Sequence, residues 1–217
     1  MTRGATGRRP RLAVLDYGIG NLRSAEKALE HQGADARLTT DVAEIEAADG
    51  LVLPGVGHFG ACMQALRDRG LDELARVAIA ADRPFLGICV GAQMLFDGSE
   101  EAPEVAGIGA VPGTNRRLPA GVKHPQMQWN RLDVARPSAM LAGLAEPTWM
   151  YFVHSYAPVP DPSVAADAVV ATCDYGGPVV AAVEYGSVWA TQFHPEKSSD
   201  TGLALLGNFV ASVAVAA

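Results

Sequence analysis

The chain has 217 residues, of which 49% are hydrophobic and 19% are charged, and its formal net charge at pH 7 is −7. This composition favours one packed globular domain over a disordered chain. The acidic balance argues against a broad nucleic-acid surface, which needs a local excess of Lys and Arg. No apolar run approaches the roughly 20 residues that cross a bilayer. We therefore expect a soluble protein with neither a nucleic acid nor a membrane as its partner.

The first residues and the cysteines bear on domain boundaries and cellular compartment. Residues 1–10 are rich in arginine, and no signal-peptide apolar region follows them. We expect a flexible basic tail at 1–10 and one domain at 11–217. The three cysteines, Cys62, Cys89 and Cys173, cannot all pair within the chain, and none shows the spacing of metal ligands. These features favour a cytoplasmic protein, and we expect no metal and no cofactor.

The first half of the domain has apolar patterns that alternate between the strand and the helix type. Alternation of this kind predicts an α/β domain with an open mixed, largely parallel sheet flanked by helices. The predicted strands cover 11–16, 34–39, 50–53 and 84–88, and the predicted helices cover 21–31, part of 41–49, and 59–81 with a break at Gly70.

After about residue 98 the sequence changes to short β-prone segments separated by Gly and Pro. We expect these segments to extend the same sheet as antiparallel strands. The apolar spacing of 198–213 predicts a last helix that packs on the sheet. The predicted strands of this half cover 122–129, 149–153, 168–172, 179–185 and 188–193.

The segment from Gly87 to Gly91 reads Gly-Ile-Cys-Val-Gly and joins a predicted strand to a predicted helix. This is the pattern of a nucleophile elbow, in which a strained turn lifts the nucleophile above the sheet. The two glycines leave the space that such a turn requires. The start of a helix also favours a thiolate at Cys89. From this motif alone, a buried structural cysteine is an equal alternative.

A second motif, Gln192-Phe-His-Pro-Glu196, ends a predicted strand. Positions i and i+2 of an extended chain share a face, so His194 can face Cys89 while Glu196 orients its imidazole from behind. His194 would then take the thiol proton and later protonate the leaving ammonia. Taken alone, the motif would indicate only a loop.

A third motif, Pro54-Gly-Val-Gly57, follows the strand expected beside the one that enters Cys89. Its backbone N–H groups, with that of Val90, could bind the oxyanion of a tetrahedral intermediate. An ordinary Gly/Pro turn is the alternative for this motif alone. All three motifs lie at the carboxyl ends of predicted strands, and this coincidence favours a catalytic site.

The segments Gly87–Gln93 and His194–Glu196 resemble the class I (triad) glutamine amidotransferases, and the resemblance spans nearly the whole chain. It implies the single-domain fold of that family and glutamine as the substrate. It implies a catalytic triad of Cys89, His194 and Glu196. The other site residues that it implies are Gly55, Val56 and Val90 for the oxyanion hole, and Gln93, Glu101, Ser155 and Tyr156 for holding glutamine. For Glu101, a solvated loop carboxylate is the alternative.

Further segments are similar to one branch of that family, the glutaminase subunits of imidazole glycerol phosphate synthases. They are Asp16–Asn21, Pro54–Phe59, Tyr151–Tyr156 and His194–Ser198. In that branch, the glutaminase passes ammonia to a separate (β/α)8-barrel cyclase, with which it forms a heterodimer. The cyclase forms imidazole glycerol phosphate and aminoimidazole carboxamide ribonucleotide for histidine biosynthesis. The resemblance implies an interface with the cyclase at Asn21, Met127, Trp129, Tyr151 and Lys197. For Trp129 and Tyr151, partly buried core aromatics are the alternative.

One segment departs from the pattern of that branch, which is Pro-His-x-Gly-Trp-Asn. This chain has Gln126 and Gln128 in place of the His and the Gly. The departure leaves the three triad residues unchanged, but it puts details of the interface or of gating in doubt.

Three competing interpretations stay open from the sequence. The first is a glutaminase for anthranilate, purine or pyridoxal phosphate synthesis, against which the Asp16–Asn21 and Tyr151–Tyr156 segments weigh. The second is a cysteine hydrolase or peptidase that acts alone, which high activity on varied amides would favour. The third is a regulatory binding module without catalysis, against which the intact Cys, His and Glu residues weigh.

Overall fold

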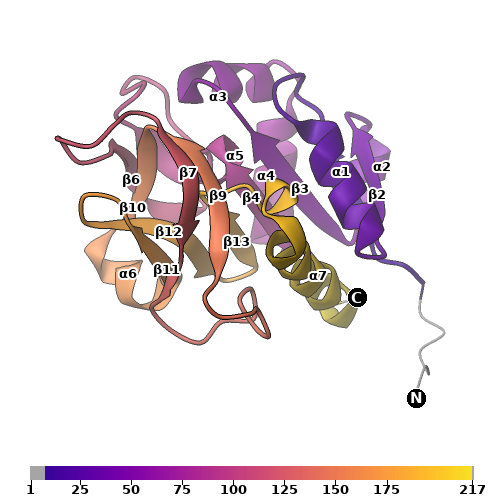
Figure 1. Cartoon of the computed structure of the whole chain (residues 1–217). Coiled ribbons are helices and arrows are strands. Elements are labelled where there is room, and N and C mark those ends of the chain that lie inside the picture. Colours follow the sequence, from indigo (N-terminus) through magenta and orange to yellow (C-terminus); the bar gives the residue numbers. More distant parts are fainter. Residues whose placement is uncertain (1–7, 217) are drawn as a thin grey trace.

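The computed structural model describes residues 8–216, so residues 1–7 of the predicted basic tail lie outside the described part. Within residues 8–216, the largest sheet has eight strands in the order β2-β1-β3-β4-β13-β12-β11-β8. Helices α1 and α7 lie side by side on one face of this sheet, while α4 lies behind β3 and β4 (Figure 1). Among these residues, no helix is both long and apolar enough to span a membrane.

Five strands form the parallel part of the large sheet, and four of them come from the half of the chain predicted to be parallel. Every residue of the three central strands is buried, because helices cover both faces of a parallel sheet and leave only apolar runs inside. The five strands are β1 (Arg11–Leu15), β2 (Asp35–Thr39), β3 (Gly50–Gly55), β4 (Phe85–Cys89) and β13 (Val188–Thr191).

The helices follow the predicted order, and local signals fix their ends. Asp41 caps α2 by accepting a hydrogen bond from the Glu44 N–H at 2.9 Å. Gly70, at φ +66°, separates α3 from α4 at the predicted break. The helices are α1 (Leu22–His31), α2 (Val42–Glu46), α3 (Phe59–Arg67), α4 (Leu71–Ala80), α5 (Val90–Gln93), α6 (Pro162–Ala168) and α7 (Ser199–Ala216), with a 3-10 turn η1 (Pro195–Lys197).

The second half corrects two expectations about the sheet. Strands β12 (Pro178–Tyr185), β11 (Val169–Asp174) and β8 (Asp133–Val134) do extend the large sheet in antiparallel fashion. Strand β13, also expected to be antiparallel, does pair antiparallel with β12, but it runs parallel to its other neighbour, β4. The reason is that a tight hairpin after β12 reverses the chain direction, so that β13 points the same way as β4. The carboxyl ends of β13 and β4 therefore lie side by side.

The segments 122–129 and 149–153 were expected in the large sheet but form a separate ribbon of β7 (Gln126–Arg131) and β9 (Trp149–His154). The ribbon packs its inner side against the end of the large sheet, where the Phe152 ring lies 5.5 Å from the Phe193 ring. A third sheet, without a predicted counterpart, contains β5 (Phe96–Ser99), β6 (Val111–Arg117) and β10 (Tyr156–Pro160).

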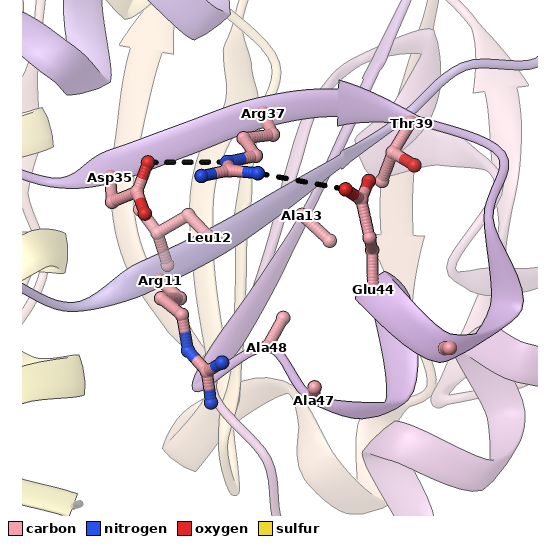
Figure 2. Close-up of a pocket in the computed structure, with 10 residues that line it drawn as sticks. Arg11, Leu12, Ala13, Asp35, Arg37, Thr39, Glu44, Ala47 and Ala48 are labelled. Atoms are coloured by element: carbon pink, nitrogen blue, oxygen red, sulfur yellow. Dashed lines mark hydrogen bonds and ion pairs between the residues drawn. The ribbon is translucent and has the colours of Figure 1, made fainter.

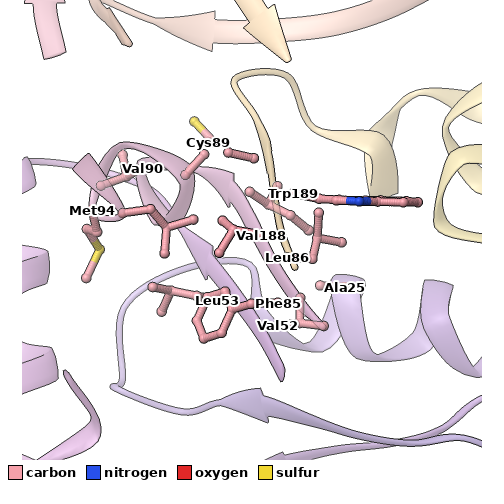
Figure 3. Packing of buried hydrophobic residues seen from close by; sticks show 14 of the residues in the cluster. Ala25, Val52, Leu53, Phe85, Leu86, Cys89, Val90, Met94, Val188 and Trp189 are labelled. Carbon is pink, nitrogen blue, oxygen red and sulfur yellow. The ribbon is translucent and has the colours of Figure 1, made fainter. Parts of the chain in front are cut away.

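The hydrophobic core surrounds the central strands and ends at the nucleophile motif. Figure 3 shows Leu53, Phe85 and Val188 packed together below Cys89, which stands at the end of β4. On the α7 side, the Trp189 ring lies 5.6 Å from that of Phe209. The core therefore holds the strand that carries Cys89 on both of its faces.

Candidate active site

The backbone at Cys89 is strained in the way that the elbow motif predicts. Cys89 has φ +55° and ψ −115°, a conformation that side chains other than glycine rarely adopt. A Cβ at Gly91 would overlap the carbonyl of Leu53, and one at Gly87 would lie 2.7 Å from the Ala92 Cα. Both glycines are therefore required by close packing around the turn from β4 into α5.

His194 and Glu196 follow β13 and form a buried pair. The His194 Nδ1 lies 2.8 Å from the Glu196 Oε1, and both side chains are only 2% exposed. The backbone N–H of His194 donates to the Tyr151 carbonyl at 2.9 Å, so β9 fixes its position. Because a carboxylate only accepts, Nδ1 carries the proton, and in the neutral imidazole Nε2 is the acceptor.

The free nitrogen of His194 is available to the thiol. Its Nε2 is buried and has no hydrogen-bond partner among the described residues. The Cys89 Sγ contacts the Val153 carbonyl at 3.8 Å and the Gln192 Nε2 at 3.7 Å. Burial by itself lowers the pKa of His194, but Cys89 and Glu196 outweigh it and raise that pKa to about 9. The surroundings of His194 therefore favour its protonated form, the imidazolium.

A cavity of about 220 Å³ opens above Cys89. All four residues predicted to hold glutamine line it, as do Val56 and Val90. Gly55 does not line the cavity, because it pairs with Cys89 in register and lies beneath, against the Tyr17 hydroxyl. The lining residues are Val56, Gly57, Cys89, Val90, Gln93, Glu101, Pro125, Val153, His154, Ser155 and Tyr156.

Two side chains of the cavity wall also organise its backbone. Gln93 donates from Nε2 to the Tyr156 carbonyl at 2.8 Å. The Glu101 carboxylate accepts from the Phe59 N–H at 2.7 Å, at the start of α3. Glu101 is therefore built into the wall and is not a freely solvated loop carboxylate.

The loop that begins at Pro54 is supported from below by two side chains that sequence reasoning did not assign. The Tyr17 hydroxyl, fully buried, donates to the Pro54 carbonyl at 2.8 Å. The Cys62 thiol donates to the Val56 carbonyl at 3.3 Å, and burial raises its pKa to about 11. In the sequence, only its position in the Asp16–Asn21 motif marks Tyr17. Its role follows from the contact with Pro54 on the neighbouring strand β3.

Gln126, one of the departures from the expected pattern, is fully buried and contacts His154 at 3.0 Å. His154 also contacts the Tyr156 carbonyl through Nδ1 at 2.8 Å, and burial lowers its pKa to about 4. His154 is therefore neutral at physiological pH. Gln128, the other departure, is exposed.

The outer side of the β7–β9 ribbon is apolar but exposed. We name Met127, Trp129, Trp149 and Tyr151 the ribbon surface. The first three are 62%, 46% and 47% exposed, so Trp129 is not a core aromatic, and its ring meets that of Tyr151 edge-on at 6.1 Å. Trp149 was not predicted for the interface. Asn21 lies before α1, where its side chain accepts from the Ser24 hydroxyl, and Lys197 is exposed at the end of η1.

A larger cavity, of about 310 Å³, lies between β1, β2 and α2 (Figure 2). Arg37 stands in it between Asp35 at 3.4 Å and Glu44 at 3.7 Å. Its lining contains neither a cysteine nor a histidine. This cavity therefore offers neither a thiol nor an imidazole.

The fold, and a cysteine beside a buried pair of imidazole and carboxylate, define the class of protein. Residues 13–213 match the family model of glutamine amidotransferase class-I, so the chain is of this class. It is similar in fold to a solved glutamine amidotransferase (TM-score 0.70, 23% identity, covering 94% of this chain and 98% of that one). It is also similar in fold to a chain of PurLQS from Thermotoga maritima (TM-score 0.69, 21% identity, covering 96% of this chain and 98% of that one).

Curated relatives identify the branch. The chain is 52% identical to the imidazole glycerol phosphate synthase subunit HisH of Synechococcus sp. (strain JA-3-3Ab), over 94% of each chain. It is 49% identical to the HisH subunit of Methanothermobacter thermautotrophicus, over 92% of this chain and 97% of that one. The chain therefore belongs to the family of imidazole glycerol phosphate synthase HisH subunits.

Proposed function

We propose that the chain hydrolyses glutamine to glutamate and ammonia as the glutaminase subunit of an imidazole glycerol phosphate synthase in histidine biosynthesis. The observation that carries the chemistry is the strained Cys89 beside the His194–Glu196 pair, whose nitrogen and oxygen lie 2.8 Å apart. The HisH relatives, about 50% identical, support the pathway over anthranilate, purine or pyridoxal phosphate synthesis.

In the proposed mechanism, the Cys89 thiol transfers its proton to the His194 Nε2, and the sulfur attacks the side-chain amide carbon of glutamine. The N–H groups of Val56 and Val90 stabilise the oxyanion of the tetrahedral intermediate. The C–N bond then breaks, and His194 returns the proton to the leaving ammonia. Water attacks the resulting γ-glutamyl thioester with His194 as the base, which releases glutamate and restores the thiol.

We assign the binding of glutamine to Gln93, Glu101, Ser155 and Tyr156. All four line the cavity above Cys89, which supports this assignment. The Glu101 carboxylate offers a negative charge to the ammonium group of the substrate. Gly55 contributes to the oxyanion loop by permitting close packing beneath it, where a side chain would meet Gly91 and Tyr17.

The partner in this proposal is the (β/α)8-barrel cyclase subunit. It forms a heterodimer with this chain and receives the ammonia directly from it. The ribbon surface supports an interface there, because two tryptophans about half exposed on one apolar patch are unusual for a surface without a partner. It adjoins the site, since the Val153 carbonyl of the same ribbon contacts the Cys89 Sγ. We include Asn21 and Lys197 in this interface and add Trp149. The free thiols of all three cysteines favour a cytoplasmic location.

A pulldown from the native source, followed by glutaminase assays, tests the proposal. We expect recovery of a (β/α)8-barrel cyclase. The isolated chain should hydrolyse glutamine slowly, and the cyclase with its nucleotide ligand should accelerate it by favouring the productive form of the oxyanion loop. Equal rates with and without the cyclase would contradict the coupling. High activity of the isolated chain on varied amides would favour a cysteine hydrolase that acts alone.

A further inference from the structure

Gln192 is a buried amide next to the nucleophile that the mechanism above does not use. Its side chain is 1% exposed. The Gln192 Nε2 lies 3.7 Å from the Cys89 Sγ, and its Oε1 accepts from the Gln93 Nε2 at 2.9 Å. The backbone N–H of Gln192 donates to the Ala181 carbonyl on β12 at 2.9 Å, which holds the residue in place.

A backbone carbonyl fixes which way this amide points. The Tyr156 carbonyl can only accept, so the end of the Gln93 amide that faces it is the NH2 group. The same NH2 group faces Gln192, so the atom it meets must be the oxygen. The Gln192 NH2 group is then directed at the Cys89 sulfur. This series of hydrogen bonds, from the Tyr156 carbonyl through Gln93 and Gln192 to the sulfur, fixes which atom is nitrogen and which is oxygen in both amides.

The two contacts of the Cys89 sulfur favour different protonation states. The Val153 carbonyl, at 3.8 Å, can only accept and therefore engages the neutral S–H group. The Gln192 NH2 group can only donate and therefore favours the thiolate. When the proton moves to His194, the sulfur can no longer donate to the Val153 carbonyl. It can still accept from the Gln192 NH2 group.

We infer that Gln192 is a further catalytic residue: its amide donates to the Cys89 thiolate and is held in that orientation by Gln93, in the wall of the glutamine cavity. The inference rests on the proposed glutaminase reaction for its kinetic consequence, but the reactivity of the sulfur can be measured without glutamine. Gln192 does not line the cavity, so its loss should slow turnover more than it weakens glutamine binding.

The test compares Gln192→Met with Gln126→Met in the full chain. Gln126 is the matched control, because it is also fully buried and its side-chain amide lies 3.9 Å from a cysteine sulfur, that of Cys173. The rate of Cys89 alkylation by iodoacetamide is followed across pH by peptide mass spectrometry. The titratable groups around this sulfur are His194 after β13, Tyr17 after β1 and Cys62 in α3, together with Glu101 and His154 in the cavity wall. All of them stay unchanged in both variants.

For Gln192→Met we expect alkylation about tenfold slower at pH 7, as for the loss of one hydrogen bond to a charged group, with recovery to the wild-type rate at high pH. The complex with the cyclase should show a kcat about tenfold lower and a KM changed less than about twofold. Gln126→Met should keep the wild-type alkylation profile of Cys89. If Gln192→Met does not fold, Gln192→Glu keeps the shape, offers no donor at pH 7 and should slow alkylation at least as much.

Three results would overturn the inference: a wild-type alkylation profile in a folded Gln192 variant, an equal loss of rate at every pH, or the same shift in Gln126→Met. The last two would indicate distortion of the core instead of a lost donor. A shifted alkylation profile in a chain without glutaminase activity would uphold the role of Gln192 beside the sulfur and reject the proposed function.

Discussion

The cavity beside β2 and the cavity above Cys89 differ in chemistry more than in size. The larger one, between β1, β2 and α2, contains an arginine whose charge is compensated by two carboxylates. The smaller one is lined by a strained cysteine, Cys89. Behind this cysteine lie His194, a buried histidine with a raised pKa, and the buried amide of Gln192. The reactive site is therefore marked by a buried polar atom without a hydrogen-bond partner among the described residues, the His194 Nε2, and not by the volume of its cavity.

Topology explains why the smaller cavity has these groups. Gly55 pairs with Cys89 at the ends of β3 and β4, and Thr191 pairs with Ile88 at the end of β13. Three parallel strands therefore deliver the oxyanion loop, the nucleophile and the base to one edge of the sheet. The larger cavity lies beside β2, the first strand in the order of the large sheet. Its lining contains no residue of the oxyanion loop, the elbow or the His194 segment.

The largest expected effect separates the two cavities directly. Cys89→Ala should lower glutamine-dependent synthesis by the complex at least about 1,000-fold, because no thioester can form. Synthesis from added ammonium salts at high pH should persist, since the acceptor reaction belongs to the cyclase. Arg37→Met, in the larger cavity, should change neither rate by more than about twofold. Product formation with each nitrogen source is the measurement, and loss of both activities in Cys89→Ala would show that this chain takes part in the synthase step itself.

A second effect concerns the buried histidine in the wall of the smaller cavity. The pKa of His154 is lowered to about 4 by burial, whereas the unfolded chain has a value near 6.5. Between these values the unfolded state binds the proton and the folded state does not, so stability is complete above about 6.5 and is lost as the pH falls toward 4. The loss should reach roughly 3 kcal/mol. Urea unfolding of wild type and His154→Gln between pH 7 and 4 measures it, and parallel pH profiles of the two would contradict the assignment.

A smaller effect tests whether the ribbon surface serves the partner. Trp129→Ala should weaken binding to the cyclase by about 2 kcal/mol, as for other aromatic hot spots. The thermal midpoint should change little, because Trp129 is 46% exposed and packs on Tyr151 at the surface. Calorimetric affinity and thermal unfolding are measured on the same samples. A collapse of the midpoint with unchanged affinity would reject the interface.

The sequence predicts the parallel half of the fold and the order of its motifs, because those features are local. The run at 84–88 is apolar without interruption, and the glycines around Cys89 mark the turn at fixed spacing. Gly70 marks a helix break by itself. Such signals need no knowledge of distant residues.

The remaining features depend on packing that the sequence does not encode locally. Strand β6 shows no strict alternation of buried and exposed residues, so no period marks it as a strand. The β7–β9 ribbon is placed by the contact of Phe152 with Phe193, which is distant in the sequence. Gln192 shares a face with His194 by the period of two, but only the fold brings Gln93 within 2.9 Å of it and gives it a role.

The central claim is that Cys89 is the nucleophile for glutamine, and an electrophilic glutamine analogue with a chloroketone in place of the side-chain amide tests it most directly. Burial raises the pKa values of Cys62 and Cys173 to about 11, so both thiols stay protonated at pH 7. We predict one label per chain, on Cys89, together with loss of glutaminase activity and protection by glutamine. Label on Cys62 or Cys173, or full glutaminase activity in the labelled chain, would contradict the account.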